Sequence, residues 1–295
     1  INKSKKNVLV AVVVNNPPRE QCPFAKFANN RKTLELLTND ELSLQSTYCD
    51  LFAIDASSPG FEIDVKEGVG RARKIGFDSV LTHLDWESSP VFCSLDADTI
   101  VEDDYVSEIS DFFSKNKDYQ AVCLRFKHEL PEPSEEKEAI ILYELFMRYY
   151  ALGLGIAGSP YAYYAIGSAM AFKAEAYVKV AGIPPRNGGE DFYFMQSLRK
   201  NGKIGFLNAT CVHPSARLSD RVPFGTGPKL KQYISENTGQ YFYNQKIFTL
   251  LLKPLFSFIN SDDFYALSSD PEKMLEKMPE LVRDFMKSEK FEESW

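Results

Sequence analysis

Apolar runs alternate with mixed polar segments over the first 130 residues. The run NVLVAVVVNNPP at 7–18 is continuous and ends in Asn and Pro, as expected of a buried strand. CDLFAIDASS at 49–58 and PVFCSLDAD at 90–98 repeat the pattern. Segments of helical character follow these runs, at 25–43, 65–83 and 102–116. The alternation predicts an α/β fold with a mostly parallel central sheet flanked by helices.

The second half of the chain is less regular. A helix is predicted at 136–155, and residues 161–182 read as a strand running into a helix that stops at Gly182. Another helix is predicted to start near Glu190 and to stop at Gly202. Helical segments predominate beyond residue 230, which predicts a helical C-terminal extension at 230–295 packing on a catalytic domain at 1–229.

The segment QKIFTLLLKPLFSFINSDDF at 245–264 is the most apolar part of that extension. It is too short to span a bilayer, and Pro254 should end or kink a helix there. Packing on the catalytic domain is the favoured interpretation. The alternative is that part of the segment rests on a membrane, although only Lys246 and Lys253 supply nearby positive charge.

The overall charge limits the classes of partner. A net charge of -7 argues against a general nucleic-acid or anionic-membrane binder, because either needs a basic surface. We expect no apolar run to be long enough for a transmembrane helix, and the five cysteines include no CxxC pair. We therefore expect a cytoplasmic protein with at most peripheral contact to the inner face of a membrane.

Carboxylates follow the third apolar run at alternate positions, Asp96 and Asp98. A calcium loop of the EF-hand type is excluded, because its sixth position is Val101 and its twelfth is Ser107. Two carboxylates at a strand end can hold a hard divalent ion that also binds substrate phosphates. The acids at 102–104 are better explained as the first turn of the next helix.

Polar residues at strand ends should converge, because ligands of such sheets lie beyond the carboxyl ends of the strands. Asn15 and Asn16 follow the first run, Asp55 ends the second, and Asp96 and Asp98 follow the third.

Two further segments carry candidate chemistry. In GGEDFYF, Glu190 and Asp191 either open a helix or act as a general base, and the preceding glycines should make them mobile and accessible. In CVHPSARLSDRVPFGTGPK, His213 precedes Arg217 and Arg221 in a glycine-containing loop. Clustered arginines in an acidic protein suit recognition of a diphosphate.

The order of these motifs resembles that of family 2 glycosyltransferases with the GT-A fold. The motifs are a strand-end Asp, Gly-x-Gly-x-Ala-Arg at 68–73, Asp-x-Asp at 96–98, Gly-Ser-x-Met-x-Phe at 167–172, Glu-Asp at 190–191, and then a His and an Arg-rich loop. The resemblance covers roughly residues 7 to 227.

Two departures from the family pattern matter. The usual Ala-Arg-Asn reads Ala72-Arg73-Lys74, and the Gln-x-x-Arg-Trp motif of processive synthases is absent, since Arg199 is followed by Lys200. The second departure argues against a polymerising, membrane-embedded synthase.

The resemblance implies an inverting, metal-dependent transfer of a sugar from a nucleotide diphosphate donor to a hydroxyl of a saccharide or lipid-linked acceptor. It implies Asp191 as the catalytic base, with Glu190 second. It also implies roles in donor and metal binding. The donor-binding set is Asn15, Asp55, Arg73, Asp96, Arg217 and Arg221, and the ligands of Mn²⁺ or Mg²⁺ are Asp98, Asp96 and His213.

Two alternatives stay open. A nucleotidyltransferase that forms a nucleotide-sugar shares the sheet and the metal carboxylates, but needs a glycine-rich basic loop where this chain reads NNPPREQCPF. A non-catalytic carbohydrate-binding protein needs neither the metal carboxylates nor a base.

Overall fold

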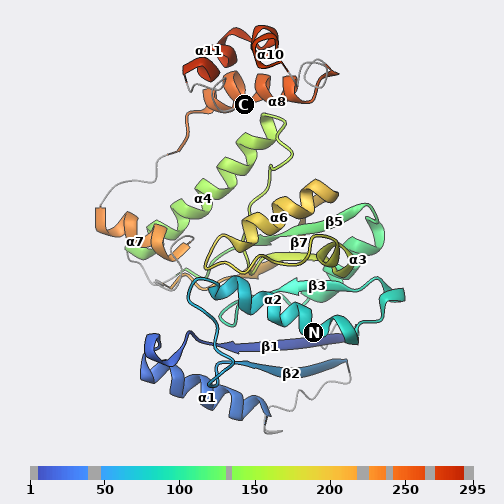
Figure 1. Ribbon diagram of the computed structural model, residues 1–295, viewed down its shortest axis with the longest axis vertical. Coiled ribbons are helices and arrows are strands. Elements are labelled where there is room, and N and C mark those ends of the chain that lie inside the picture. The colour runs from blue at the N-terminus through green and yellow to red at the C-terminus, as the bar shows by residue number, and fades with distance from the viewer. Residues whose placement is uncertain are drawn as a thin grey trace. The chain divides into compact units, whose positions relative to one another are not determined.

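The computed structural model describes residues 6–38, 48–130, 135–217, 226–236, 242–262 and 270–288. Contacts divide the chain into two compact units (Figure 1). The first comprises Ile1–Ile140 and Ala165–Asn237, and the second comprises Ile141–Tyr164 and Thr238–Trp295. The boundary expected at residue 229 thus falls inside the first unit, and residues 141–164 group with the C-terminal part.

Two parallel strands of the first unit, β1 (Val8–Asn15) and β2 (Cys49–Ala56), form a small sheet. Both are apolar runs expected to be strands. Helix α1 (Phe24–Thr38) lies between them in the sequence and packs against both. The strand register places Val14 opposite Asp55 and Asn15 opposite Ala56, so the polar residues predicted at these two strand ends are neighbours.

The larger sheet has the strand order β3-β6-β5-β7-β4. Its strands are β3 (Val91–Ser94), β4 (Ile100–Val101), β5 (Tyr119–Phe126), β6 (Met170–Lys173) and β7 (Lys203–His213). The α/β class, with a central sheet flanked by helices, is confirmed.

The direction of the strands differs from the prediction. Strands β5 and β7 are parallel, but β6 is antiparallel to β3 and β5, and β4 is antiparallel to β7. The larger sheet is therefore mixed and not mostly parallel. Met170, the first residue of β6, pairs with Cys123 in the middle of β5, and Phe172 pairs with Ala121, so β6 runs back along β5.

An aromatic cluster joins this sheet to three helices, α2 (Gly68–Val80), α5 (Ala174–Lys179) and α6 (Glu190–Asn201). The ring of Phe172 in β6 lies 4.8 to 6.0 Å from the rings of Phe77, Tyr177 and Phe194, one from each helix. Phe172 and Phe194 are fully buried, and each such ring contributes roughly 1.5–3 kcal/mol by leaving water. The cluster fixes α6, whose first residues belong to the candidate site.

Helix α2 contacts both sheets. Gly76 packs against Val13 of β1, and the ring of Phe77 lies 4.9 Å from that of Phe92 in β3. Because one helix touches both sheets, Arg73 on that helix has a fixed position relative to the strands of each. The first unit also contains α3 (Tyr105–Lys115), which packs against β7, and α7 (Thr226–Glu236).

The acids before α3 do not lie in its first turn, where they were expected, because the helix begins only at Tyr105. Asp104 instead accepts a hydrogen bond from the hydroxyl of Thr210 at 2.7 Å, and Glu102 pairs with His213 at 2.9 Å. Both acids therefore fasten this segment to β7.

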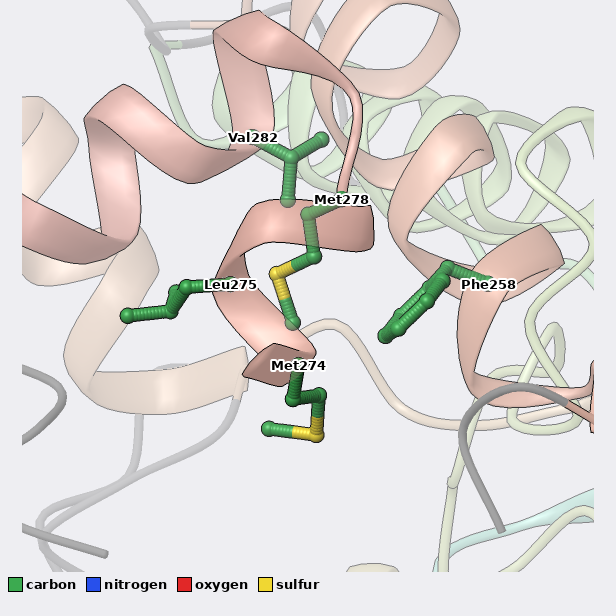
Figure 2. Close-up of a cluster of buried hydrophobic side chains, with 5 residues drawn as sticks. All are labelled: Phe258, Met274, Leu275, Met278 and Val282. Carbon is green, nitrogen blue, oxygen red and sulfur yellow. The ribbon is translucent and has the colours of Figure 1, made fainter. Parts of the chain in front are cut away.

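The second unit is helical. It contains α4 (Glu135–Ile156) from Ile141 onward, a π-helix at Ile247–Leu252, α8 (Lys253–Ile259), α10 (Pro271–Lys277) and α11 (Glu280–Ser288). A helix was expected to end or kink at Pro254, and the π-helix changes to α-helix one residue before it, at Lys253. Phe258 belongs to a buried hydrophobic cluster of this unit. Figure 2 shows it with the other members, Met274, Leu275, Met278 and Val282.

Helix α4 changes one expectation from the sequence. It has 22 residues, its most apolar stretch has a mean hydropathy of 1.3, and 22% of that stretch is buried. By length and composition alone it could cross a membrane, contrary to the expectation that no segment approaches that length. Its ion pair between Arg148 and Glu144, at 2.7 Å, lies within the same helix.

Candidate active site

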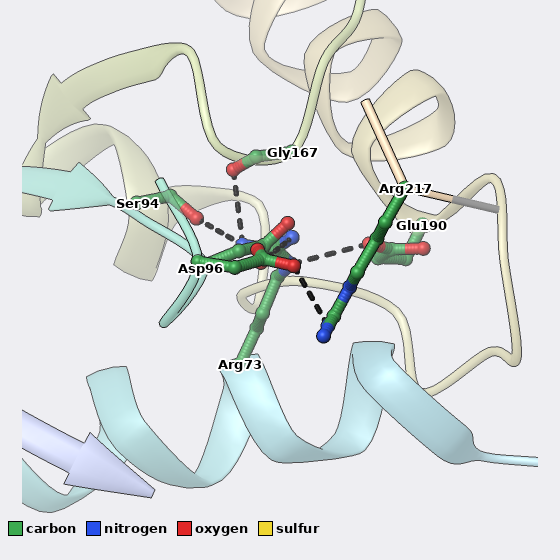
Figure 3. A network of polar contacts seen from close by, with 7 residues as sticks. Arg73, Ser94, Asp96, Gly167, Glu190 and Arg217 are labelled. Carbon is green, nitrogen blue, oxygen red and sulfur yellow. Dashed lines mark hydrogen bonds and ion pairs between the residues drawn. The ribbon is translucent and has the colours of Figure 1, made fainter. Parts of the chain in front are cut away.

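Arg73 is the centre of a polar network just beyond strand β3 (Figure 3). Its Nε donates to Oε1 of Glu190 at 3.2 Å, and its Nη2 pairs with Oδ1 of Asp96 at 2.7 Å. Its Nη1 donates to the hydroxyl of Ser94 at 2.5 Å and to the carbonyl oxygen of Gly167 at 3.0 Å. These contacts use four of the five N–H donors of a guanidinium. One side chain thus joins the segments after β3, before β6 and at the start of α6.

The centre of this network is closed to solvent. The side chain of Arg73 is 9% exposed and that of Glu190 is 5% exposed. Burial acts to lower the pKa of Arg73, but the carboxylates of Asp96, Glu190 and Asp191 raise it above its ordinary value. Arg73 is therefore a permanent cation. A buried cation needs paired acids around it, so Arg73 holds these acids together.

Glu190 and Asp191 open helix α6 and differ in environment. Burial raises the pKa of Glu190 to about 7, the charge of Asp191 acts in the same direction, and Arg73 opposes both. Burial also raises the pKa of Asp191, against the charge of Arg73 and a hydrogen bond from the backbone N–H of Phe192. Glu190 is buried, whereas Asp191 is only half-buried. Asp191 thus combines access with a raised pKa, which suits a general base.

The loop before α6 is fixed in place by α2. The N–H of Gly70 donates to the carbonyl oxygen of Arg186 at 3.0 Å. Gly188 and Gly189 have φ values of 108° and 69°, a backbone region that favours glycine. The glycines therefore shape a turn. The expectation that they make Glu190 mobile and accessible does not fit its burial.

Asp98 pairs with a second arginine. Nη2 of Arg217 lies 2.7 Å from Oδ2 of Asp98, and the two side chains are 54% and 32% exposed. Asp96 and Asp98 are therefore each paired with an arginine from a distant segment. Together with Glu190 and Asp191, they give four carboxylates against two guanidiniums, which leaves excess negative charge when all four acids are ionised.

The polar ends of β1 and β2 form a second part of the predicted site. Oδ1 of Asp55 accepts hydrogen bonds from the backbone N–H groups of Ser57 and Ser58, each at 2.9 Å. Burial acts to raise the pKa of Asp55, but these bonds lower it below its ordinary value. Asn16 is buried and donates to the carbonyl oxygen of Ser57 at 3.2 Å, whereas Asn15 beside it is exposed. Asp55 is therefore an ionised, fixed acceptor at this edge.

His213 has partners at both ring nitrogens. Its Nε2 lies 2.9 Å from Oε1 of Glu102, and its Nδ1 lies 3.0 Å from the carbonyl oxygen of Lys127. In this arrangement neither nitrogen points to Asp96 or Asp98 as a metal ligand. Arg221, also predicted from the sequence, lies outside the described residues.

Within the described ranges, no three His, Cys, Asp or Glu side chains come close enough together to hold a metal ion. The ligand set expected from the sequence, Asp96, Asp98 and His213, is thus not assembled. The arginine pairs use Oδ1 of Asp96 and Oδ2 of Asp98, so each acid has a second oxygen. Mg²⁺ is usually held by one or two carboxylates together with substrate phosphates. The residues fit a cation of that kind, held jointly with a phosphate ligand.

Sequence reasoning gave no site role to two members of the network, Ser94 and Gly167, although Gly167 opens the motif at 167–172. Ser94 is buried at the end of β3. A serine in an otherwise apolar strand is the signal that could have identified it, because a buried hydroxyl needs a hydrogen-bond partner. Gly167 packs directly against Arg73, because a Cβ at that position would lie 2.4 Å from Nη2 of Arg73. No sequence pattern reveals such a close approach.

No protein-family model matches the chain, and no curated protein matches it. Among solved structures, the chain is similar to a crystal structure of GalNAc-T7 with UDP, GalNAc and Mn²⁺, at 15% sequence identity and a TM-score of 0.42. The match covers 93% of this chain and 58% of that one, so this chain spans little more than half of its length. A similarity of this degree supports no conclusion about the ligands or the activity of this chain.

Proposed function

We propose that the chain is an inverting glycosyltransferase that moves a sugar from a nucleotide diphosphate donor to a hydroxyl of a saccharide or lipid-linked acceptor. The observation that carries the proposal is the Arg73 network. It brings the Asp96-x-Asp98 segment and the Glu190–Asp191 pair onto one buried cation from positions far apart in the sequence.

Asp191 is the proposed base. Transfer with inversion requires a group that removes the proton of the acceptor hydroxyl as that oxygen attacks the anomeric carbon. Asp191 is half-buried, and burial raises its pKa, which makes its carboxylate a better proton acceptor than a solvent-exposed one. Glu190 is buried against Arg73, and its proposed role is to position the start of α6.

Asp96 and Asp98 are the proposed residues that hold a divalent cation together with the donor diphosphate. Mn²⁺ or Mg²⁺, when bound, offsets the charge that develops on the leaving nucleoside diphosphate. The excess of carboxylates over guanidiniums in the network supports this role. Asp55 and Asn15, at the neighbouring strand ends, are proposed to contact the nucleoside, and Arg217 the diphosphate.

Slow hydrolysis of the donor tests this proposal without knowledge of the acceptor. Purified protein is incubated with a panel of nucleotide-sugars, with and without MnCl₂, and release of nucleoside diphosphate is measured. We expect Mn²⁺-dependent release from one donor class, and loss of that release in Asp98→Asn. A nucleotidyltransferase would instead form a nucleotide-sugar and pyrophosphate from a sugar phosphate and a nucleoside triphosphate. A binding protein would release neither pyrophosphate nor nucleoside diphosphate. Formation of pyrophosphate, or no release at all, overturns the proposal.

A further inference from the structure

The two arginines that pair with Asp96 and Asp98 differ in one respect. The side chain of Arg73 is 9% exposed and has further partners in Glu190, Ser94 and Gly167. The side chain of Arg217 is 54% exposed, and the pair that it forms with Asp98 is open to solvent on both sides. The difference lies in the arginines, because both carboxylates are partly exposed, Asp96 at 45% and Asp98 at 32%.

We infer that Arg217 is an exchangeable counter-ion of Asp98: it occupies this carboxylate until a diphosphate arrives, then moves to the phosphate oxygens and leaves Asp98 to a divalent cation. The inference rests on the proposed function and adds an order of binding to it. Asp98 is expected to bind a divalent cation weakly when no diphosphate is present, and more tightly when the diphosphate binds with it.

The energies of the two contacts favour such an exchange. An exposed ion pair contributes little, because water screens it and two side chains must be held in one geometry. A guanidinium can bind a phosphate through two parallel charge-assisted hydrogen bonds, which are stronger in a closed site than the solvent-exposed pair with Asp98. Arg73 cannot exchange in this way, because its departure would leave Glu190 buried without its cation.

The pair also opposes binding of a cation alone. While Arg217 is 2.7 Å from Asp98, its positive charge cancels that of the carboxylate and repels a second cation. Among the described residues no three-ligand metal cluster exists to compensate for this repulsion. Removal of the charge of Arg217 should therefore strengthen the binding of a cation alone and weaken the binding of a diphosphate.

The experiment measures binding of Mn²⁺ alone by electron paramagnetic resonance, with no nucleotide present. We expect Arg217→Gln to bind Mn²⁺ about fivefold more tightly than the wild type, because the cation no longer has to displace an exposed ion pair. Lys203→Gln is the matched control, because it removes one positive charge from an exposed pair with Asp118 at the opposite end of β7. The double variant Arg217→Gln, Asp98→Asn should lose the gain.

A second arm measures the affinity for UDP and for GDP in the presence of Mn²⁺ by calorimetry. Arg217→Gln should bind the preferred nucleotide at least fivefold more weakly, because the guanidinium that moves to the diphosphate is missing. Equal Mn²⁺ affinity in Arg217→Gln and Lys203→Gln overturns the inference, and so does unchanged nucleotide affinity. The proposed function is judged separately, by release of nucleoside diphosphate from the donor panel. If that test fails, the Mn²⁺ arm still decides whether Arg217 blocks Asp98.

Discussion

The Nε atom of Arg73 donates to Oε1 of Glu190 at 3.2 Å across 117 positions of sequence. Both side chains are buried, so neither can leave the other without an uncompensated charge in the interior. Helix α2 and the start of α6 are therefore joined at the same place where the candidate base lies. This contact therefore links the stability of the fold to the geometry of the site.

Replacement of Arg73 by methionine should destabilise the protein strongly. The variant keeps the apolar stem and removes the charge that Glu190, Asp96 and Asp191 face. Loss of one partner of a buried pair costs about 3–5 kcal/mol, whereas loss of an exposed pair costs less than about 1 kcal/mol. Urea unfolding near neutral pH measures the difference. Arg31→Met is the control, because Arg31 pairs with Glu35 on the surface of α1. Equal losses in the two variants would show that the network contributes no special stability.

The raised pKa of Glu190 predicts a specific dependence of stability on pH. Burial raises this pKa from its ordinary 4.5 to about 7, so the folded chain binds the proton more tightly than the unfolded chain. The contribution of Glu190 to stability is therefore greatest at low pH, and it is lost as the pH rises from about 4.5 through about 7.

Glu190→Gln removes this titration. The free energy of unfolding of the wild type, measured against that of the variant, should fall between about pH 5 and about pH 8. A series of urea titrations over this range gives the difference directly. A constant difference at every pH would mean that Glu190 titrates normally in the folded protein.

Several features of the site could be predicted from the sequence because they are local. Asp96 and Asp98 follow an apolar run, and the run is the strand β3. Helix α6 begins at Glu190, where two glycines are followed by acids and an apolar face. Local pattern determines where an element starts and ends, and these starts and ends place the candidate acids.

The partners of these acids could not be predicted. Asp98 faces Arg217, and Glu190 faces Arg73, because the packing of α2, α6 and β7 brings distant segments together. The antiparallel direction of β6 is equally invisible, since an apolar run reads the same in either direction. His213 was expected near the metal, and its pairing with Glu102 follows from the two-residue strand β4 beside β7.

Gly70 should be essential for the position of the loop before α6. A Cβ at Gly70 would lie 2.5 to 2.7 Å from backbone atoms of Pro184 and Arg186, and backbone atoms in a packed loop cannot move away easily. Gly70→Ala should therefore displace this loop and destabilise the protein by about 1–3 kcal/mol, as overpacking does elsewhere.

Gly76→Ala, at a position further along the same helix, is the control. A Cβ there would meet only the side chain of Val13, at 3.0 Å, and alanine is the better helix former by about 1 kcal/mol. Thermal unfolding should show a clear loss for Gly70→Ala and little change for Gly76→Ala. Equal stability of the two variants would contradict the close packing of α2 against this loop.

Asp191→Asn should separate catalysis from donor binding. The base acts on the acceptor, so the variant should lose roughly two to four orders of magnitude in turnover while donor affinity stays near that of the wild type. Glu190→Gln is the comparison, because its carboxylate is buried against Arg73 and has no access to an acceptor. It should keep more activity than Asp191→Asn. Turnover with the identified donor and acceptor, together with the donor dissociation constant from calorimetry, gives both quantities. An active Asp191→Asn beside an inactive Glu190→Gln would assign the base to Glu190 and require this buried acid to become exposed during the reaction.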